Sequence, residues 1–208
     1  MHLDSKLRLE IGQASIQGPK EENEDCIGIR IGDGDLLSTK GAISAIADGV
    51  TAAEHGRIAS ETCVQGFISD YFSTPESWEV KKAAQTILNA LNQWLYSQGR
   101  DLQDERKGCV TTLSILVIKS RKAHIFHIGD SRIHRYRDGS LEQLTRDHST
   151  QASEETCYLT RAMGMHLSLK IDYRVVEVEA GDLFLSTTDG AHEHLSEEEV
   201  GDILDHRR

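Results

Sequence analysis

The sequence lacks the features that mark membrane and secreted proteins. No stretch reaches the ~18 consecutive apolar residues of a transmembrane helix, and the N-terminal MHLDSKLRLE has no hydrophobic signal region. Only two prolines are present, and there is no proline-rich linker, internal repeat or low-complexity segment. We therefore expect a cytoplasmic protein without a membrane segment, with residues 1–208 forming a single domain.

Cysteine is scarce and scattered. No Cys-x-x-Cys pair is present among Cys26, Cys63, Cys109 and Cys157. This spacing predicts free thiols in a reducing compartment and not disulfides or a zinc site. Ten histidines are present, but the two close pairs have no third ligand at zinc spacing, so we interpret them as surface or strand residues. These pairs are His124 with His127 and His192 with His194.

Positive charge is also scarce, with 23 lysines and arginines against 34 aspartates and glutamates and a net charge of −11. Such a chain is unsuited to nucleic acid as its main partner, because phosphate backbones are bound by basic surfaces. To act on a phosphorylated substrate it would need local cations from metals or from a few basic side chains. With 38% apolar and 27% charged residues, the composition is that of a globular domain with a sizeable core.

The hydrophobic pattern predicts strands, two long helices, further strands and a last helix. Alternating or β-branched runs indicate strands at Leu7–Ile16, Cys26–Ile31, Ala42–Ala47, 109–118, 122–129, 131–139, 141–145, 173–182 and 183–188. The Arg-Asp-Gly at 137–139 is a hairpin signal. Consecutive strands with segregated helices favour an α+β fold over a βαβ sheet.

The helical segments have recognisable starts and faces. Glu54–Phe72 carries an apolar stripe at spacing four, which we expect to be buried. A second helix should open with Thr74 as its N-cap and turn Trp94 towards the core. We expect a weak helix at 153–163, and a last helix opened by Ser196 and the three glutamates after it.

An apolar stretch, AISAIADG at 42–49, ends on a carboxylate and a glycine. A carboxylate at the mouth of a buried strand is costly unless something pairs with it. Gly49 lets the backbone turn sharply, so that its carbonyl can face the same ligand as Asp48. Two such oxygens suit a hard cation such as Mg²⁺ or Mn²⁺. On this stretch alone, an ordinary strand-to-turn exit is the simpler explanation.

The same pattern recurs elsewhere in the chain. Two further apolar segments end in an acid, at Asp130 and Asp189, and an acidic pair, Glu24 and Asp25, precedes a strand. Strand ends in packed sheets can meet at one rim, where converging carboxylates would repel one another unless cations lay between them. The recurrence therefore predicts a multi-metal site with all-oxygen ligands.

Short motifs in a fixed order make the chain recognisable. They are KEENED at 20–25, ADGV at 47–50, EHG at 54–56, GCVTTL at 108–113, GDSRIHRYRDGSLEQLTRDHS at 129–149, LTRAMG at 159–164 and STTDG at 186–190. With these motifs the chain resembles the metal-dependent PP2C-type (PPM) serine/threonine protein phosphatases. The resemblance implies two packed antiparallel β-sheets flanked by helices, with the metals at one end of the sandwich.

The resemblance also assigns roles to the acidic positions. Asp48 corresponds to the carboxylate that bridges two metals, with the Gly49 carbonyl on one of them, and Asp189 to a ligand of the second metal. Asp130 resembles the ligand of a third, weaker metal in bacterial members. The expected cofactors are therefore two Mg²⁺ or Mn²⁺ ions, with a third at Asp130.

The remaining roles concern water and substrate. Glu24 and Asp25 would hold metal-bound waters, and Lys20 falls where the family commonly has an arginine that grips the substrate phosphate. A lysine supplies the charge but not a bidentate fork, and a solvated loop charge explains Lys20 equally well on the sequence alone. A metal-activated water would attack the phosphorus of phosphoserine or phosphothreonine in proteins, without a phosphoenzyme. The resemblance thus makes Asp48, Asp25 and Lys20 the expected catalytic residues.

The chain departs from the family pattern near the reaction centre. Val50 stands where some members have a histidine that can serve as general acid, and we assign neither His55 nor His148 in its place. The segment between Asp147 and Leu159 is short where the family carries a mobile flap. This short segment, and the lysine in place of the arginine, resemble the phosphatase half of bifunctional phosphatase–kinase proteins. Besides a phosphorylated protein substrate, a separate or fused serine/threonine kinase is therefore an expected partner.

The family closes with an Asp-containing motif on a final strand, and the sequence has no such motif. Asp202 and Asp205 lie on the expected last helix and lack its context. We therefore expect a domain that is incomplete at its C-terminal end and lacks its last strand, which leaves one sheet edge open and weakens the second metal. The alternative is a catalytically impaired pseudophosphatase or a regulatory interaction domain.

Two other phosphatase chemistries fit poorly. A cysteine phosphatase needs Cys-x₅-Arg, and none of the cysteines has an arginine at that spacing. Asp33-Gly-Asp35 has the spacing of an aspartyl-phosphate motif, but it lies in a polar turn and lacks the Thr or Val that should stand at Leu37.

Overall fold

The structure is a computed structural model that describes residues 8–50, 55–100, 108–151 and 157–206. Its elements, in chain order, are β1 (Asp25–Ile31), α1 (Asp35–Thr39), β2 (Ala42–Asp48), α2 (Gly56–Ser73), α3 (Val80–Arg100), β3 (Leu113–Lys119), β4 (Lys122–Ile128), β5 (Arg132–Arg137), β6 (Ser140–Gln143), β7 (Ser149–Gln151), β8 (Cys157–Leu159), β9 (Asp172–Glu177), β10 (Leu183–Thr187), α4 (Asp189–His192) and α5 (Glu197–Asp205).

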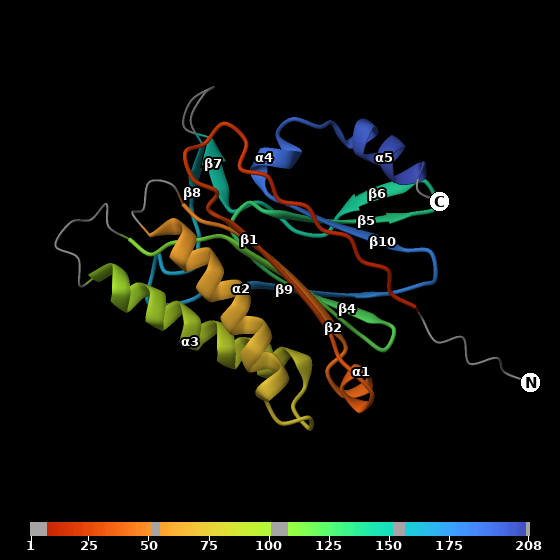
Figure 1. Cartoon of the computed structure of the whole chain (residues 1–208), viewed down its shortest axis with the longest axis horizontal. Coiled ribbons are helices and arrows are strands. Elements are labelled where there is room, and N and C mark those ends of the chain that lie inside the picture. Colours follow the sequence, from red (N-terminus) through yellow and green to blue (C-terminus); the bar gives the residue numbers. More distant parts are fainter. Residues whose placement is uncertain (1–7, 51–54, 101–107, 152–156, 207–208) are drawn as a thin grey trace, which may run out of the picture.

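The strands form two packed antiparallel sheets and a small separate pair (Figure 1). The larger sheet has the order β1-β2-β3-β4-β9, and the smaller has the order β10-β5-β6. β7 pairs with β8 beside them. Asp138 and Gly139 turn the expected β5–β6 hairpin with φ angles of 50° and 81°. The expected α+β sandwich flanked by helices is therefore confirmed.

α2 and α3 lie side by side on the outer face of the larger sheet (Figure 1). Their apolar side chains, with the facing residues of β2, β3 and β4, form the larger of two cores. The expected stripe on α2, which is Ala59, Cys63, Phe67 and Tyr71, is at most 2% exposed. Burial also raises the pKa of the Cys63 thiol, which makes this cysteine a packing residue and not a reactive one.

A second core fills the space between the two sheets. It includes Leu116 and Ile125 of the larger sheet, Ile133 of the smaller sheet, and Val178 from the connection between them. Because β9 belongs to the larger sheet and β10 to the smaller, the turn between them carries the chain across the sandwich. α4 and α5 lie on the other side of the smaller sheet from this core (Figure 1).

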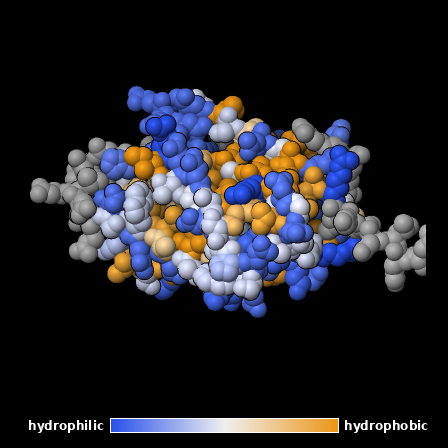
Figure 2. Space-filling view, turned by 60° about the horizontal axis from the view of Figure 1, so that its bottom comes forward, coloured by the Kyte–Doolittle hydropathy of each residue, from blue (hydrophilic) through white to orange (hydrophobic). Residues whose placement is uncertain are grey.

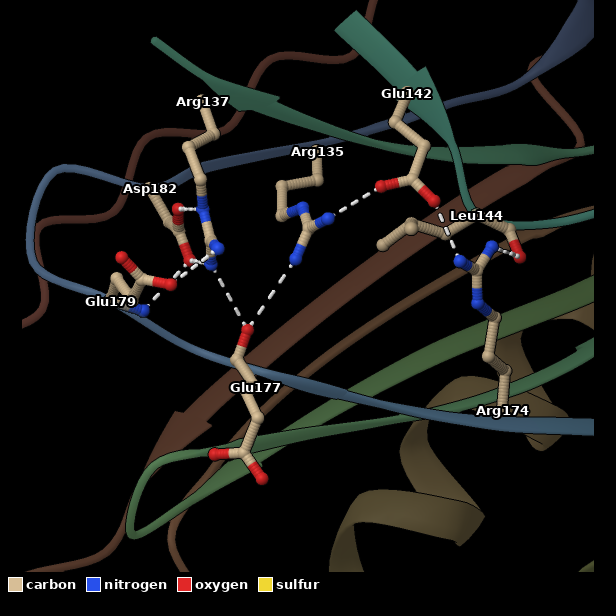
Figure 3. Close-up of polar contacts among 8 residues, drawn as sticks. All are labelled: Arg135, Arg137, Glu142, Leu144, Arg174, Glu177, Glu179 and Asp182. Carbon is tan, nitrogen blue, oxygen red and sulfur yellow. Dashed lines mark hydrogen bonds and ion pairs between the residues drawn. The ribbon is translucent and has the colours of Figure 1, made fainter. Parts of the chain in front are cut away.

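Charged side chains tie the two sheets together where the chain crosses between them (Figure 3). Arg137 donates hydrogen bonds of 2.6 and 2.7 Å to the two carboxylate oxygens of Asp182. Arg135 of β5 pairs with Glu142 of β6, and Arg174 of β9 reaches the same carboxylate from the larger sheet. This network therefore links the two sheets by ion pairs beside the core that lies between them.

Asp182 makes this end of the sandwich sensitive to acid. Burial by itself would raise the pKa of the Asp182 carboxyl, but hydrogen bonds from Arg137 and from the Glu179 amide outweigh burial and hold that pKa below its ordinary value. The carboxylate therefore adds stability above pH ~4, near the pKa of an unfolded aspartate. This contribution is lost as the pH falls through the lower pKa of the folded state.

We expect Asp182→Asn to lower the melting temperature by several degrees at pH 7, because the ionised partner of Arg137 is removed. The difference from the wild type should shrink when melting curves are recorded down to pH 3. Asp202→Asn, at an exposed position on α5, is the matched control and should change little. A difference between Asp182→Asn and wild type that stays constant over this range would contradict the ion-pair explanation.

Two boundaries differ from the expectation. Residues 8–16 form no strand, because no described strand pairs with them. Their side chains Ile11 and Ile16 are 47% and 89% exposed. Leu7, the first residue of the expected strand, lies outside the described residues. Thr74 does not open α3, because it is the C-cap of α2. α3 begins only at Val80, after a turn. The hydroxyl of Thr74 serves α2 by donating to the Tyr71 carbonyl.

Other local differences come from short elements and from one aromatic residue. Trp94 is 43% exposed and not part of the core. Where a weak helix was expected at 153–163, the described part forms β8 and a bridge between Met163 and Thr111 instead. Residues 153–156 lie outside the described residues, and so does Glu54, the expected first residue of the first long helix. α1 and α4 are too short for a helical period to show. Ser196 does open α5, through a capping box with Glu199.

The surface combines apolar and polar side chains. Figure 2 shows hydrophobic residues interrupted by hydrophilic ones over one face of the molecule. The exposed apolar side chains include Ile31, Leu37 and Ile58. None of the helices in the described residues combines the length and the hydrophobicity that a membrane span requires.

Candidate metal centre

The acidic strand ends lie together at one end of the sandwich. Asp48, the last residue of β2, lies directly opposite Asp25, the first residue of β1, and residues so paired have Cβ atoms roughly 5 Å apart. Asp130 lies just beyond the end of β4, and Asp189 just beyond the end of β10. Segments far apart in the sequence thus bring four carboxylates to one rim.

Asp48 and Asp189 are in direct contact. Asp48 is only 9% exposed, and its carboxyl is hydrogen-bonded to that of Asp189. Burial, the charge of Asp189, this hydrogen bond and the charge of Asp25 together raise the pKa of Asp48 well above its ordinary value. A buried carboxylate and a partly buried one this close are compatible only when a proton or a cation lies between them. The pair therefore has the electrostatics of a cation site.

Asp130 lies within the field of the same pair. Burial and the charge of Asp189 raise the pKa of Asp130 to about 6, while a hydrogen bond from its own backbone opposes the shift. Asp147 and Glu193 add further negative charge around it. The structure therefore places Asp130 in the same acidic region as Asp48 and Asp189, as the sequence predicts.

Glu24 and Lys20 approach the rim from the loop before β1. The Glu24 carbonyl accepts hydrogen bonds from the Gly49 amide at 3.1 Å and from the Ser60 hydroxyl at 2.6 Å. Its carboxylate packs against Gly56, at the start of α2. Lys20 is exposed, and its positive charge is near enough to lower the pKa of Asp48. Lys20 is therefore near Asp48, and Glu24 lies where the end of β2 meets the start of α2.

Gly49 is required for a reason other than the expected sharp turn. Its φ angle lies outside the left-handed region, so its conformation does not by itself demand glycine. A Cβ at this position would instead lie 2.3 Å from the carbonyl group of Gly56. The close approach of α2 to the end of β2 therefore excludes any side chain at position 49.

Two threonines of the GCVTTL motif fix the backbone of Asp48, a role that the sequence did not reveal. The Asp48 amide donates to the Thr112 hydroxyl at 2.9 Å, and its carbonyl accepts from the Thr111 hydroxyl and the Thr112 amide, both at 2.9 Å. The Thr112 hydroxyl also contacts that of Ser131, next to Asp130, at 2.7 Å. Thr112 therefore links the backbone positions of two acidic residues.

His148 has a positioning role of the same kind. It is 3% exposed, its amide donates to the Gly129 carbonyl, and its Nδ1 accepts from the Gly129 amide. Nε2 therefore carries the hydrogen and donates to Asp172 at 3.0 Å. Because both ring nitrogens are occupied, His148 is a brace for the segment before Asp130 and not a general acid. Thr188 similarly donates to Asp25 at 3.0 Å.

The donor set suits a hydrated hard cation. The rim groups are carboxylates, which suit Mg²⁺ and Mn²⁺ better than softer metals. Among the described residues, no three acidic, imidazole or thiol groups surround a single point as a ready-made cation site. The carboxylates meet in pairs instead, so an ion held there needs water for its other ligands, as Mg²⁺ ordinarily does. The histidines expected to be strand or surface residues have other partners: His124 contacts Tyr173, and His127 contacts Ser114.

Comparisons with known proteins agree with this geometry. Residues 20–207 match the family model described as protein phosphatase 2C. The chain is 30% identical over 176 residues to protein phosphatase PhpP of Streptococcus pneumoniae, covering 76% of this chain and 71% of PhpP. Among solved structures, the S. agalactiae serine/threonine phosphatase superposes with a TM-score of 0.76 at 25% identity, covering 94% of this chain and 83% of that one.

The metal expectation is matched by another solved structure. The catalytic domain of the serine/threonine protein phosphatase PstP, in complex with two manganese ions, has a TM-score of 0.70 at 25% identity and covers 89% of this chain and 79% of its own. The resemblance read from the motifs, the sandwich fold and the Mg²⁺ or Mn²⁺ dependence are thereby confirmed. The chain belongs to the protein phosphatase 2C family, a class of metal-dependent serine/threonine phosphatases.

Proposed function

We propose that this protein removes phosphate from phosphoserine and phosphothreonine side chains of proteins at the rim formed by Asp25, Asp48, Asp130 and Asp189. Family membership supports the reaction. The observation that carries the assignment of the site is the hydrogen-bonded contact of Asp48 with Asp189, beside the cross-strand partner Asp25. The alternative of an impaired interaction domain is not favoured, because the family matched along most of the chain is enzymatic.

The side chains at this rim have different roles in the proposed reaction. When bound, divalent cations lower the pKa of a water molecule and neutralise phosphoryl oxygens. Asp48 and Asp189 would hold that charge between the two sheets, and Thr188 keeps the Asp25 carboxylate turned towards the same place. Lys20 adds an exposed positive charge near Asp48, where it can meet a phosphoryl oxygen. Glu24 supplies a further carboxylate for ordering water.

The role of Lys20 is directly testable. We expect Lys20→Met to lower kcat/KM for a phosphothreonine peptide by about tenfold or more, since one positive charge on the transferring phosphoryl group is lost. Lys20→Arg should keep or improve the wild-type value, because a guanidinium adds a bidentate fork. The measurement is steady-state hydrolysis in Mn²⁺.

Lys82→Met is the matched control, because Lys82 is an exposed lysine of α3 that stacks on Trp78. Its kcat/KM should equal that of the wild type. Equal kcat/KM for Lys20→Met and Lys82→Met would mean that Lys20 is only a solvated loop residue.

The finer expectations about partners and domain completeness are also proposals. A serine/threonine kinase is the class of enzyme that must supply a phosphorylated protein substrate, and the short segment before Leu159 is what favours such a partner here.

For the domain, we propose that one further strand completes the smaller sheet. The support is that β10 pairs with β5 alone among the described strands, which leaves its other edge open. Asp202 and Asp205 lie on the helix α5, so neither of them belongs to the proposed strand.

A further inference from the structure

A pocket lined by several charged side chains lies at the end of the larger sheet opposite the acidic rim. Its volume is about 590 Å³, and it is formed by the β3–β4 turn, β9 and the start of α3. In the register of β3 and β4, Lys119 pairs with Lys122 at this end, whereas Leu113 pairs with Ile128 beside the rim. Strands of this length span roughly 20 Å, so the pocket is separate from the catalytic site.

The pocket concentrates positive charge in an otherwise acidic protein. Its basic lining residues are Lys81, Lys119, Arg121 and Lys122. Among the described residues, none of these four makes an ion pair with a carboxylate, and Lys81 instead rests over the Tyr173 ring at 5.1 Å. These four cations are therefore not held in ion pairs within the described part of the fold.

Neighbouring groups respond to this positive field. Burial lowers the pKa of His124, on the pocket wall, and the charges of Lys122 and Lys119 lower it further. The pKa of Lys40 is also lowered, first by burial, and the charge of Lys119 adds to the shift while Glu76 opposes it. The N-terminus of the long helix α3 faces the same pocket through Val80 and adds the positive end of its dipole.

Two carboxylates, Glu79 and Glu177, also line the pocket. Glu177 lies across from Lys122, which lies across from Lys119, so one row of the sheet carries two positive charges and one negative charge. In Figure 3 the Glu177 carboxylate points away from the arginine network, to which the residue contributes only its carbonyl oxygen. Four basic residues against two acidic ones leave the pocket with a net positive charge of about two.

We propose that this pocket binds a phosphate monoester or a free phosphate dianion, at a site separate from the catalytic rim. A dianion matches the excess of positive charge, and flexible lysines together with the guanidinium of Arg121 are suitable donors for phosphate oxygens. On a protein of net charge −11, most other surfaces repel such a ligand. The pocket is larger than one phosphate group, which leaves room for the group that carries it. The Tyr173 ring on the pocket wall is already covered by Lys81 and stacked on Phe126. Charge and not ring stacking therefore selects the ligand.

The test is isothermal titration calorimetry on the full chain with EDTA present. Without divalent cations the acidic rim repels phosphate and hydrolyses nothing, so bound phosphate reports on the pocket alone. The titrants are inorganic phosphate, a phosphothreonine peptide and the same peptide without phosphate. We expect saturable binding of at least one phosphate-bearing titrant and none of the unphosphorylated peptide. Equal affinity for phosphate and phosphopeptide would identify the free anion as sufficient, and tighter binding of the phosphopeptide would identify a phosphorylated side chain.

Two variants should move the affinity in opposite directions. Lys119→Glu combined with Lys122→Glu should weaken binding at least about tenfold, and Glu177→Gln should strengthen it about two- to fivefold. Lys82→Glu combined with Lys170→Glu changes the net charge equally outside the pocket and should alter affinity less than about twofold.

The proposal would be overturned if neither inorganic phosphate nor the phosphopeptide bound saturably. It would also be overturned if the two double variants lost affinity for the ligand to the same extent. If the first double variant fails to fold, as judged by its melting curve, Glu177→Gln still decides the matter, because an unchanged affinity there overturns the proposal too. None of these outcomes bears on the catalytic assignment, since no metal is present.

Discussion

Replacing Asp48 by asparagine should reduce hydrolysis of an aryl phosphate in Mn²⁺ by about a thousandfold or more. The substitution keeps the size of the side chain but removes the charge that a pair of divalent cations needs. Asp48 stands between Asp25 and Asp189, so no other rim carboxylate occupies an equivalent position. Remaining activity close to that of the wild type would rule out the metal-bridging role.

The same variant should leave the fold intact or stabilise it. Burial and the charge of Asp189 raise the pKa of Asp48, which means that ionising this carboxylate in the folded protein is unfavourable when no cation is present. A neutral amide removes that cost. In EDTA, the melting temperature of Asp48→Asn should therefore equal or exceed that of the wild type, so that lost activity cannot be attributed to unfolding.

Asp35→Asn is the matched control. Asp35 is exposed and begins α1, which precedes β2 at the end opposite Asp48. Its replacement should leave both turnover and melting temperature unchanged. A large loss of activity in this control would show that removing any surface carboxylate disturbs the enzyme.

The second large effect is expected for Thr112→Val, which removes a hydroxyl group but keeps the shape of the side chain. Thr112 is 2% exposed, accepts a hydrogen bond from the Asp48 amide and contacts the Ser131 hydroxyl. Its loss leaves a buried donor unpaired, which costs about 1–3 kcal/mol of stability. It also removes one of the hydrogen bonds that hold the Asp48 backbone and the contact with Ser131, next to Asp130. Groups that orient metal ligands in this way affect metal affinity or activity by about 10–100-fold.

Thr112→Ser separates positioning from packing. It keeps the hydroxyl and removes only a methyl group, so it should restore most of the activity that Thr112→Val loses. Steady-state kinetics at several Mn²⁺ concentrations are the measurement, because a misplaced Asp48 should raise the Mn²⁺ concentration needed for half-maximal activity. Similar Mn²⁺ requirements in the two variants would show that the hydroxyl has no positioning role.

Much of the architecture could be predicted because its causes are local. The apolar run of β2, the hairpin signal at 137–139 and the stripe of α2 each reflect a period or a turn that neighbouring residues determine. The acidic ends of strands were also visible as a recurrent pattern. What linked them into one site was the resemblance to a family, since spacing alone does not say which strand ends meet.

The predictions were wrong or incomplete where contacts with residues far away in the sequence determine the local structure. Alternation at 7–16 resembles a strand, but a strand needs a partner, and none of the described strands pairs with these residues. Trp94 keeps the helical period of α3, yet it lies at the edge of the stripe and stays 43% exposed. The roles of Thr112 and His148 depend on hydrogen bonds to residues far away in sequence. Their motifs were the available signal, but only coordinates show what their side chains contact.

The most direct test of the central claim is a calorimetric titration of Mn²⁺ into wild type and Asp48→Asn. If the carboxylates of distant strand ends jointly hold the cations, the wild type should bind at least two ions and the variant should lose at least one of them. Identical numbers of ions bound with identical affinities by the two proteins would contradict that claim.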